Sequence, residues 1–110
     1  MRMQPVKPSG FHSELVDRIL GPKAHAPLPW RRAAFDNTGP EDVRVRALVE
    51  KVATAPTEVI DADFERVSDA GLSDDQAWEI AICAAVGQAT RQYESGLQAL
   101  AAALDEEAQE

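Results

Sequence analysis

The feature that most constrains the fold is a long stretch without proline that begins at Ser73. The letters "LSDDQ" indicate how it begins: Ser73 is a good N-cap residue, and Gln76 stands where a capping box requires it. Asp74 and Asp75 then complement the positive end of the helix dipole. We therefore expect a helix that starts at Ser73 and runs about 30 residues, close to 45 Å.

A stripe of apolar residues follows this expected helix at intervals of three or four positions, which is the spacing of one helical face. A helix of about 45 Å is longer than a compact domain of 110 residues is wide. Its distal half is therefore expected to pack on something else, and a second subunit is the simplest choice. The members of this apolar stripe are Trp78, Ile82, Ala85, Val86, Ala89, Tyr93, Leu97, Leu100 and Leu104.

The rest of the chain also predicts helices, and it contains no internal repeat and no strand-like alternation. Gly21-Pro22 and Pro56 are the clearest helix stops, and an Asp61 cap with Gly71 as terminator brackets the last short helix. The expected fold class is all-α with one long C-terminal helix. The expected shorter helices cover residues 11–20, 29–37, 40–54 and 61–70.

The net charge of −8 is unevenly distributed along the chain. Residues 1–35 hold six Lys or Arg against two Asp or Glu, a surplus of +4, whereas residues 36–110 hold five against seventeen, a deficit of −12. We divide the chain into a basic N-terminal arm, residues 1–39, with one or two short helices, and a helical core with a frayed acidic tail, residues 40–110. The cations of the arm either lie against acidic surface of this chain or a neighbouring subunit, or are solvated. Arg31 and Arg32 are expected to be solvated rather than to hold an anionic ligand.

The same totals narrow the partners and the compartment. An acidic body lacks the clustered cations that phosphate contacts require, so no nucleic-acid partner is expected. No apolar run reaches about 18 residues and no signal-peptide pattern is present, so neither membrane insertion nor secretion is expected. The single cysteine, Cys83, forms no internal disulfide and fits a reducing compartment. The sequence predicts a cytoplasmic protein without a metal or cofactor.

One face of the long helix holds the candidate site. Counting by fours from Glu79 gives Cys83, Gly87 and Arg91, and the surrounding residues are apolar, so we expect this part of the helix to be covered on both sides. A buried carboxylate must meet a cation, accept hydrogen bonds or be protonated. Glu79 is therefore a structural or interface group, a ligand-binding or acid–base group, or simply a partly exposed side chain. Gly87 admits another backbone or a ligand.

Cys83 has two interpretations. A cysteine among Ile, Ala and Val behaves as a small hydrophobic residue whose thiol pKa is raised by its apolar surroundings. The alternative is a reactive thiol. His12 and His25 lie far from Cys83 in the sequence and show neither triad nor metal-site spacing.

The segment "DADFERVSDAGLSDDQAWEIAICAAVGQATRQYESGLQAL" resembles the carboxymuconolactone decarboxylase and alkylhydroperoxidase D-like superfamily. In that pattern a short helix and a GLS turn lead into a long helix rich in Ala and Val, and the likeness covers about residues 40–104. It implies an alkylhydroperoxidase D-like helical fold and assembly into trimers or hexamers. The redox branch carries a Cys-x-x-Cys followed by His before the GLS turn, and those positions fall near Pro56, Val59 and Asp63 here. The resemblance therefore places this chain in a branch that lacks the redox motif.

Three functions are carried forward. The first is a redox-inactive, homo-oligomeric accessory or small-molecule-binding protein, with a small anionic ligand near Glu79, Cys83, Gly87 and Arg91. The second is a small-molecule lyase or isomerase in which Glu79 acts as general acid/base and Arg91 holds an anionic substrate. The third is a thiol peroxidase that uses Cys83 and an external resolving thiol.

Overall fold

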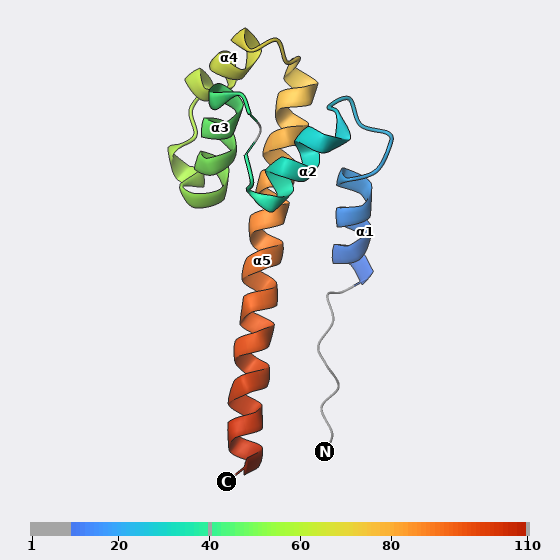
Figure 1. Cartoon of the computed structure of the whole chain (residues 1–110), viewed down its shortest axis with the longest axis vertical. Helices are drawn as coiled ribbons and strands as arrows, with labels where there is room; N and C mark the ends of the chain where they lie inside the picture. The colour runs from blue at the N-terminus through green and yellow to red at the C-terminus, as the bar shows by residue number, and fades with distance from the viewer. Residues whose placement is uncertain (1–9, 40, 110) are drawn as a thin grey trace.

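The computed structural model describes residues 10–39 and 41–109, without the side chains of residues 11 and 109. Residues 1–9 of the basic N-terminal arm and residue 110 of the acidic tail lie outside the described residues. The predicted all-α class is confirmed, because the described residues contain helices and no strand (Figure 1). The elements are α1 (Gly10–Ile19), α2 (Leu28–Asp36), α3 (Val43–Thr54), the short 3-10 helix η1 (Pro56–Glu58), α4 (Asp61–Asp69) and α5 (Asp74–Gln109).

The long helix begins where the sequence predicts. The Ser73 hydroxyl accepts a hydrogen bond from the backbone N–H of Gln76 at 3.2 Å, and the Gln76 side-chain oxygen accepts one from the Ser73 N–H at 2.9 Å. This is a complete capping box, which satisfies two of the first backbone donors. With 36 residues, α5 is about 54 Å long, even longer than predicted.

The shorter helices cluster around the first half of α5 and leave its second half standing out from the body (Figure 1). The molecule measures 58 × 28 × 21 Å along its principal axes. Helix α2 makes the most extensive contact with α5. The boundary that we placed near residue 39 thus falls between two helices, α2 and α3, that share one core.

The core is built from small and medium-sized side chains contributed by α2, α3, α4 and α5. Helix α3 turns an apolar face into the core, since Val45, Leu48 and Val49 are at most 1 % exposed. The buried cluster consists of Ala26, Ala34, Val45, Leu48, Val49, Val67, Leu72, Ala77, Ile80, Cys83 and Ala84.

The start of α4 differs from the expected Asp61 cap. The N-cap residue is Ile60, and the side chain of Asp63 accepts a hydrogen bond from the Ile60 N–H at 2.9 Å. Lys51 on α3 donates to both oxygens of Asp63, at 3.2 and 3.1 Å. The Ile60 hydrogen bond, together with Lys51, holds the pKa of the buried Asp63 below its usual range. Asp63 thus both caps α4 and ties it to α3.

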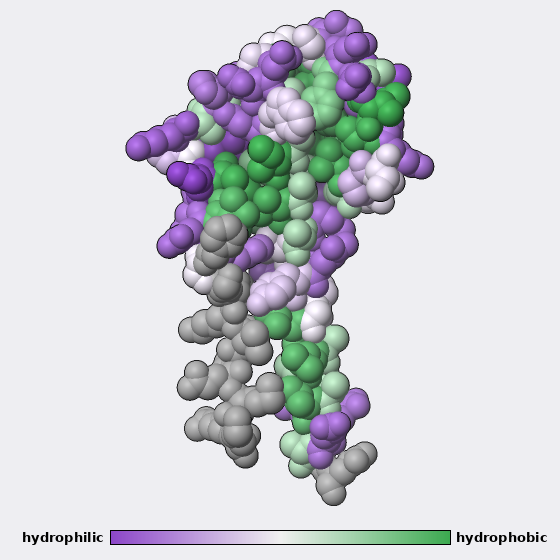
Figure 2. Space-filling view, turned by 180° about the vertical axis from the view of Figure 1, so that it is seen from behind, coloured by the Kyte–Doolittle hydropathy of each residue, from purple (hydrophilic) through white to green (hydrophobic). Residues whose placement is uncertain are grey.

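The expectation that α5 is covered on both sides is wrong for a single chain. The covered side is lined by small residues such as Ala77, Ala81 and Ala84 together with Ile80. The apolar stripe points away from the body: Trp78 is 59 %, Ile82 44 %, Tyr93 41 % and Leu100 48 % exposed. Figure 2 shows hydrophobic residues continuing from the body down the projecting part of α5. Small side chains occupy the buried face of α5 because they allow the helices to approach closely.

Within the described residues, α5 is the longest helix, yet neither it nor any other described helix combines the length and the apolar composition needed to cross a bilayer.

Candidate functional site

Glu79 lies at the covered edge of α5 and binds the loop that precedes α2. One carboxylate oxygen accepts the backbone N–H of His25 at 2.9 Å, and the other accepts that of Ala26 at 2.7 Å. Gln76, one turn earlier, donates to the carbonyl of His25 at 3.1 Å. A buried carboxylate was expected to meet a cation, accept hydrogen bonds or be protonated. In the structure Glu79 accepts hydrogen bonds. Both oxygens hold the path of the backbone, which favours the structural role.

Arg31 holds the other side of the same loop and corrects our expectation of a solvated side chain. It is only 3 % exposed. Its Nε donates to the carbonyl of Ala26 at 2.9 Å, and one terminal nitrogen donates to those of Ile19 and Gly21 at 2.9 and 2.7 Å. An arginine can be buried when its donors meet carbonyl acceptors in this way. The adjacent Arg32 is exposed, as expected.

Sequence reasoning missed Arg31, and no local signal could have identified it. The two arginines are adjacent and share the same neighbours in sequence. Only the geometry of the folded loop, which turns three carbonyls toward one point, distinguishes them.

Cys83 is buried at 1 % exposure, and its Sγ lies 3.7 Å from the carbonyl oxygen of Ile19. Burial raises the pKa of this thiol to about 11; the carboxylate of Glu79 also raises it, and Arg31 opposes the shift. A thiol in this state is a weak nucleophile at neutral pH. The contacts favour the interpretation of Cys83 as a small hydrophobic residue.

Gly87 and Arg91 mark the crossing of α5 with α2. A Cβ at Gly87 would overlap the carbonyl oxygen of Phe35, so the glycine admits another backbone, one of the two occupants that we expected. Arg91 donates to the same Phe35 carbonyl and, at 2.9 Å, to the side-chain oxygen of Gln88. The two residues therefore fix the end of α2 on α5, about two to three turns away from Glu79.

A cavity of about 410 Å³ opens between the α1–α2 connection and α5. It brings together two of the four predicted ligand-binding residues, Glu79 and Cys83, and it does not include Gly87 or Arg91. Its volume is in the range of small-molecule sites. The charged and apolar groups along its wall include Asp17, Arg18, Lys23, Glu79, Ile82 and Cys83.

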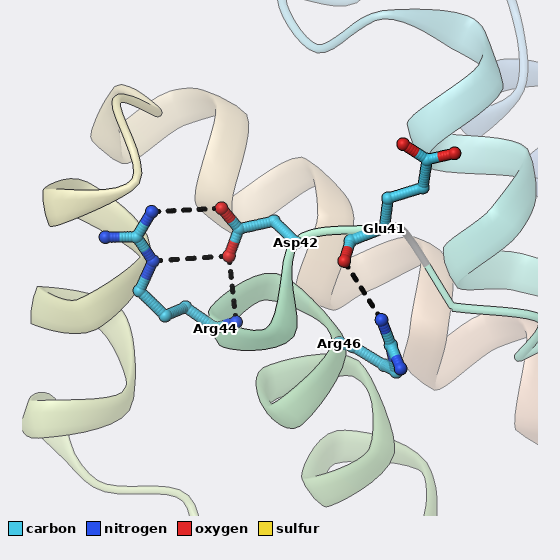
Figure 3. Close-up of polar contacts among 4 residues, drawn as sticks. All are labelled: Glu41, Asp42, Arg44 and Arg46. Atoms are coloured by element: carbon cyan, nitrogen blue, oxygen red, sulfur yellow. Dashed lines mark hydrogen bonds and ion pairs between the residues drawn. The ribbon is translucent and has the colours of Figure 1, made fainter.

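A second group of charged residues lies at the start of α3 (Figure 3). The carboxylate of Asp42 accepts the backbone N–H of Arg44 at 2.8 Å and two bonds from its side chain, at 3.2 and 3.0 Å. Arg46 donates to the carbonyl of Glu41 at 2.9 Å. The hydrogen bonds from Arg44 lower the pKa of Asp42 to about 2. This arrangement is a helix cap.

His12 and His25 make contacts that hold the fold together. His12 pairs with the hydroxyl of Thr90 at 2.9 Å and stacks on Tyr93 with ring centroids 5.9 Å apart, which attaches α1 to the middle of α5. His25 uses its backbone to hold Glu79 and Gln76. Across residues 10–39 and 41–109, no group of three or more His, Cys, Asp or Glu side chains is arranged to hold a metal ion.

Comparisons of the chain with protein-family models, with curated proteins and with solved structures find no match. The resemblance to the carboxymuconolactone decarboxylase and alkylhydroperoxidase D-like superfamily therefore remains a hypothesis based on the sequence pattern around the GLS turn and the long helix.

Proposed function

We propose that this chain is a redox-inactive accessory protein of the carboxymuconolactone decarboxylase and alkylhydroperoxidase D-like type, and that it acts by assembling with further copies of itself through the apolar stripe of α5. The proposal commits to a second copy of this chain as the occupant of that face.

The observation that carries the proposal is the exposure of the apolar stripe. Its four most exposed large side chains, Trp78, Ile82, Tyr93 and Leu100, are between 41 and 59 % exposed. From ordinary side-chain areas they present on the order of 400 Å² of apolar surface, about the size of the largest patch on a typical monomer, which often marks a functional contact. The alanines and the flanking polar side chains bring a contact along α5 near the roughly 800 Å² per partner of a stable interface.

The geometry around the candidate catalytic groups supports a non-catalytic role. Glu79 uses both oxygens to hold backbone N–H groups, and Cys83 is buried with a raised pKa. Both groups stabilise the crossing of the loop and α5. This arrangement gives the acid–base and peroxidase alternatives no free, activated side chain among these two residues.

The proposal is tested by placing a charge on the apolar stripe. Leu100→Glu should shift the molar mass measured by sedimentation at tens of micromolar from an oligomer to a monomer, because a carboxylate cannot be buried unpaired in an apolar contact. Gln98→Glu adds the same charge to the same turn at an exposed position off the stripe and should leave the mass unchanged. A monomeric wild-type chain at this concentration contradicts the proposal.

The cavity beside Glu79 and Cys83 favours a second candidate function, the binding of a small anionic ligand. Its wall combines the cations Arg18 and Lys23 with apolar groups such as Ile82. An aliphatic or aromatic monocarboxylate fits this chemistry better than a dicarboxylate, because Asp17 and Glu79 lie on the same wall.

Titration with benzoate and with hexanoate, followed by NMR, tests the second candidate. Saturable shifts at the amides of residues 17–24 are expected, and Lys23→Gln should weaken binding several-fold, whereas Arg32→Gln, an exposed cation outside the cavity, should not. The absence of saturation at millimolar concentrations contradicts this candidate.

A further inference from the structure

We propose that two copies of α5 pair antiparallel about a two-fold axis that passes beside residue 91, so that the bare half of each helix lies on the apolar stripe of the covered half of its partner. This inference rests on the proposed self-association and specifies its geometry.

The length of α5 favours this pair. Residues 74–91 and 92–109 are equal halves of 18 residues each, about 27 Å. The first half is covered by its own chain on the core side, whereas the second half, which we call the bare half, is exposed or only partly buried among the described residues, with His12 stacked on Tyr93 at its start. In an antiparallel pair each bare half gains the partner's body beside it, whereas in a parallel pair the two bare halves would have only each other.

The sizes of the side chains that meet also favour this pair. An axis beside residue 91 brings together residues at equal distances on either side of it. The two pairs nearest the axis then set an alanine of the first half against a large residue of the second, which allows the helices to approach closely there, and the two outer pairs set large apolar residues against each other. The resulting pairs are Ala89 with Tyr93, Ala85 with Leu97, Ile82 with Leu100, and Trp78 with Leu104.

An in-register parallel pair would set each residue against its own copy. Tyr93 would then meet Tyr93 and Trp78 would meet Trp78, while Ala85 and Ala89 would meet only alanine methyl groups. The pairs of large side chains would hold the two helices too far apart for the alanines to touch. The voids left between the alanines would lose van der Waals contacts.

The period of the stripe suits a long contact between two such helices. Its members recur at an eleven-residue spacing, as Trp78, Ala89 and Leu100 show. Eleven residues correspond to 3.67 residues per turn, close to the 3.6 of a straight helix, and such a repeat produces a gentle right-handed crossing. Two helices with this pattern can stay in contact over the full stripe with little supercoiling.

The charge of the second half disfavours a parallel pair. After Arg91 the chain contains no Lys or Arg, and the described acids of the second half are Glu94, Asp105, Glu106 and Glu107. A parallel pair would set two acidic ends side by side. An antiparallel pair moves them more than 30 Å apart, several Debye lengths at physiological salt. Each end then lies near Asp74 and Asp75 of the partner; the cations Arg18 and Lys23 line the cavity that Ile82 borders, and Ile82 is about two turns farther along the helix.

The pairing has two structural consequences. Ile82 belongs both to the apolar stripe and to the wall of the 410 Å³ cavity, so Leu100 of the second copy would close the open side of that wall. A two-fold contact also builds even-numbered assemblies. A hexamer made of three such pairs is compatible with it, and a trimer built through α5 is not.

The orientation is measured by the distance between spin labels at Ala102→Cys in a Cys83→Ala background, with unlabelled Cys83→Ala as the control for mass and helicity. Position 102 is exposed and lies on the side of the helix opposite the stripe. The antiparallel pair predicts an even-numbered mass and labels separated by about 33 Å along the axis. A parallel pair predicts no separation along the axis, so the labels lie about 20 Å apart across the pair, since each helix is about 10 Å wide.

The outcomes distinguish the antiparallel geometry from self-association through α5 itself. An even-numbered mass with the long distance supports the antiparallel pair. The short distance, or a trimer disrupted by Leu100→Glu, overturns the antiparallel pair and leaves self-association through α5 intact. A monomer, or an oligomer whose mass does not respond to Leu100→Glu, overturns the proposed function itself.

Discussion

The two halves of α5 belong to one unbroken helix and yet depend on opposite conditions. In the first half, small residues pack against α2, α3 and α4, and Glu79 and Arg91 bind backbone groups of the chain that covers them. In the second half, every described residue from 92 to 109 whose burial is assigned is exposed or only partly buried. The first half is stabilised within one chain, whereas the described chain leaves the apolar residues of the second half exposed or only partly buried.

Matched substitutions in the two halves of α5 therefore test whether the chain covers only the first half. A change in the first half should alter the stability of the isolated chain, and the equivalent change in the second half should not. Stability is measured by urea unfolding, followed by circular dichroism, at a concentration low enough for the chain to be monomeric.

The glycines give the largest expected contrast. Gly87→Ala forces a Cβ into the backbone of Phe35, which cannot move without displacing α2, so the free energy of unfolding should fall by about 3 kcal/mol or more. Gly96→Ala meets nothing within 4 Å and should raise stability by up to about 1 kcal/mol through helix propensity. Equal effects at the two positions would contradict the close crossing of α2 and α5.

Apolar residues give the second contrast. Ile80 is fully buried, and Ile80→Ala should lower the free energy of unfolding by about 3 kcal/mol, as the loss of a core side chain does. Leu100 is 48 % exposed, and Leu100→Ala should change it by less than about 0.5 kcal/mol in the monomer. At concentrations at which the chain associates, the contrast reverses: Leu100→Ala should weaken the oligomer, and Ile80→Ala should not. A large loss of monomer stability at Leu100 would mean that its own chain covers it.

The acidic residues Glu79 and Glu94 give the third contrast. Glu79→Ala removes the acceptors of two backbone N–H groups and should lower the free energy of unfolding by about 2 kcal/mol; Glu79→Gln keeps one acceptor and should lower it by about half as much. Glu94→Ala, at an exposed position, should have almost no effect. If Glu79→Gln unfolds like the wild-type chain, the side chain is free for an acid–base role after all.

How much the sequence could predict depends on how local each cause is. The capping box of Ser73 and Gln76 and the helix stop at Pro56 are set by neighbouring residues, and the sequence predicted them. Gly87 was recognised as a point of close approach, although the sequence left open whether a backbone or a ligand approaches it. Arg31 was placed in solvent, because its acceptors lie on a loop that only the fold positions.

The orientation of α5 was the instructive error. The bulky residues of the apolar stripe marked one face, and the small residues around Ala84 marked another. Size decided which face turned inward, since the close crossing of α2 tolerates alanine and glycine and excludes Trp or Leu. Hydrophobicity alone therefore identified both apolar faces without telling which one the chain covers by itself.

The cysteine gives the smallest effect on stability and the sharpest chemical readout. Burial raises the pKa of Cys83 from its ordinary value of 9.0 to about 11, so its thiolate fraction at pH 8 should be about 100-fold lower than that of a free thiol. Because the pKa is raised on folding, the neutral thiol contributes to stability below pH 9, and this contribution is lost as the pH rises from about 9 to 11.

Reaction with a coloured disulfide reagent at pH 8 measures this directly. Native Cys83 should react at least about 100-fold more slowly than in urea. The matched control is Ser95→Cys in a Cys83→Ala background, because position 95 lies on the same helix but in the bare half, where it is exposed. That thiol should react at the rate of a free one. Fast reaction of native Cys83 would instead show a thiol that is accessible and ionised, and would return the peroxidase alternative to consideration.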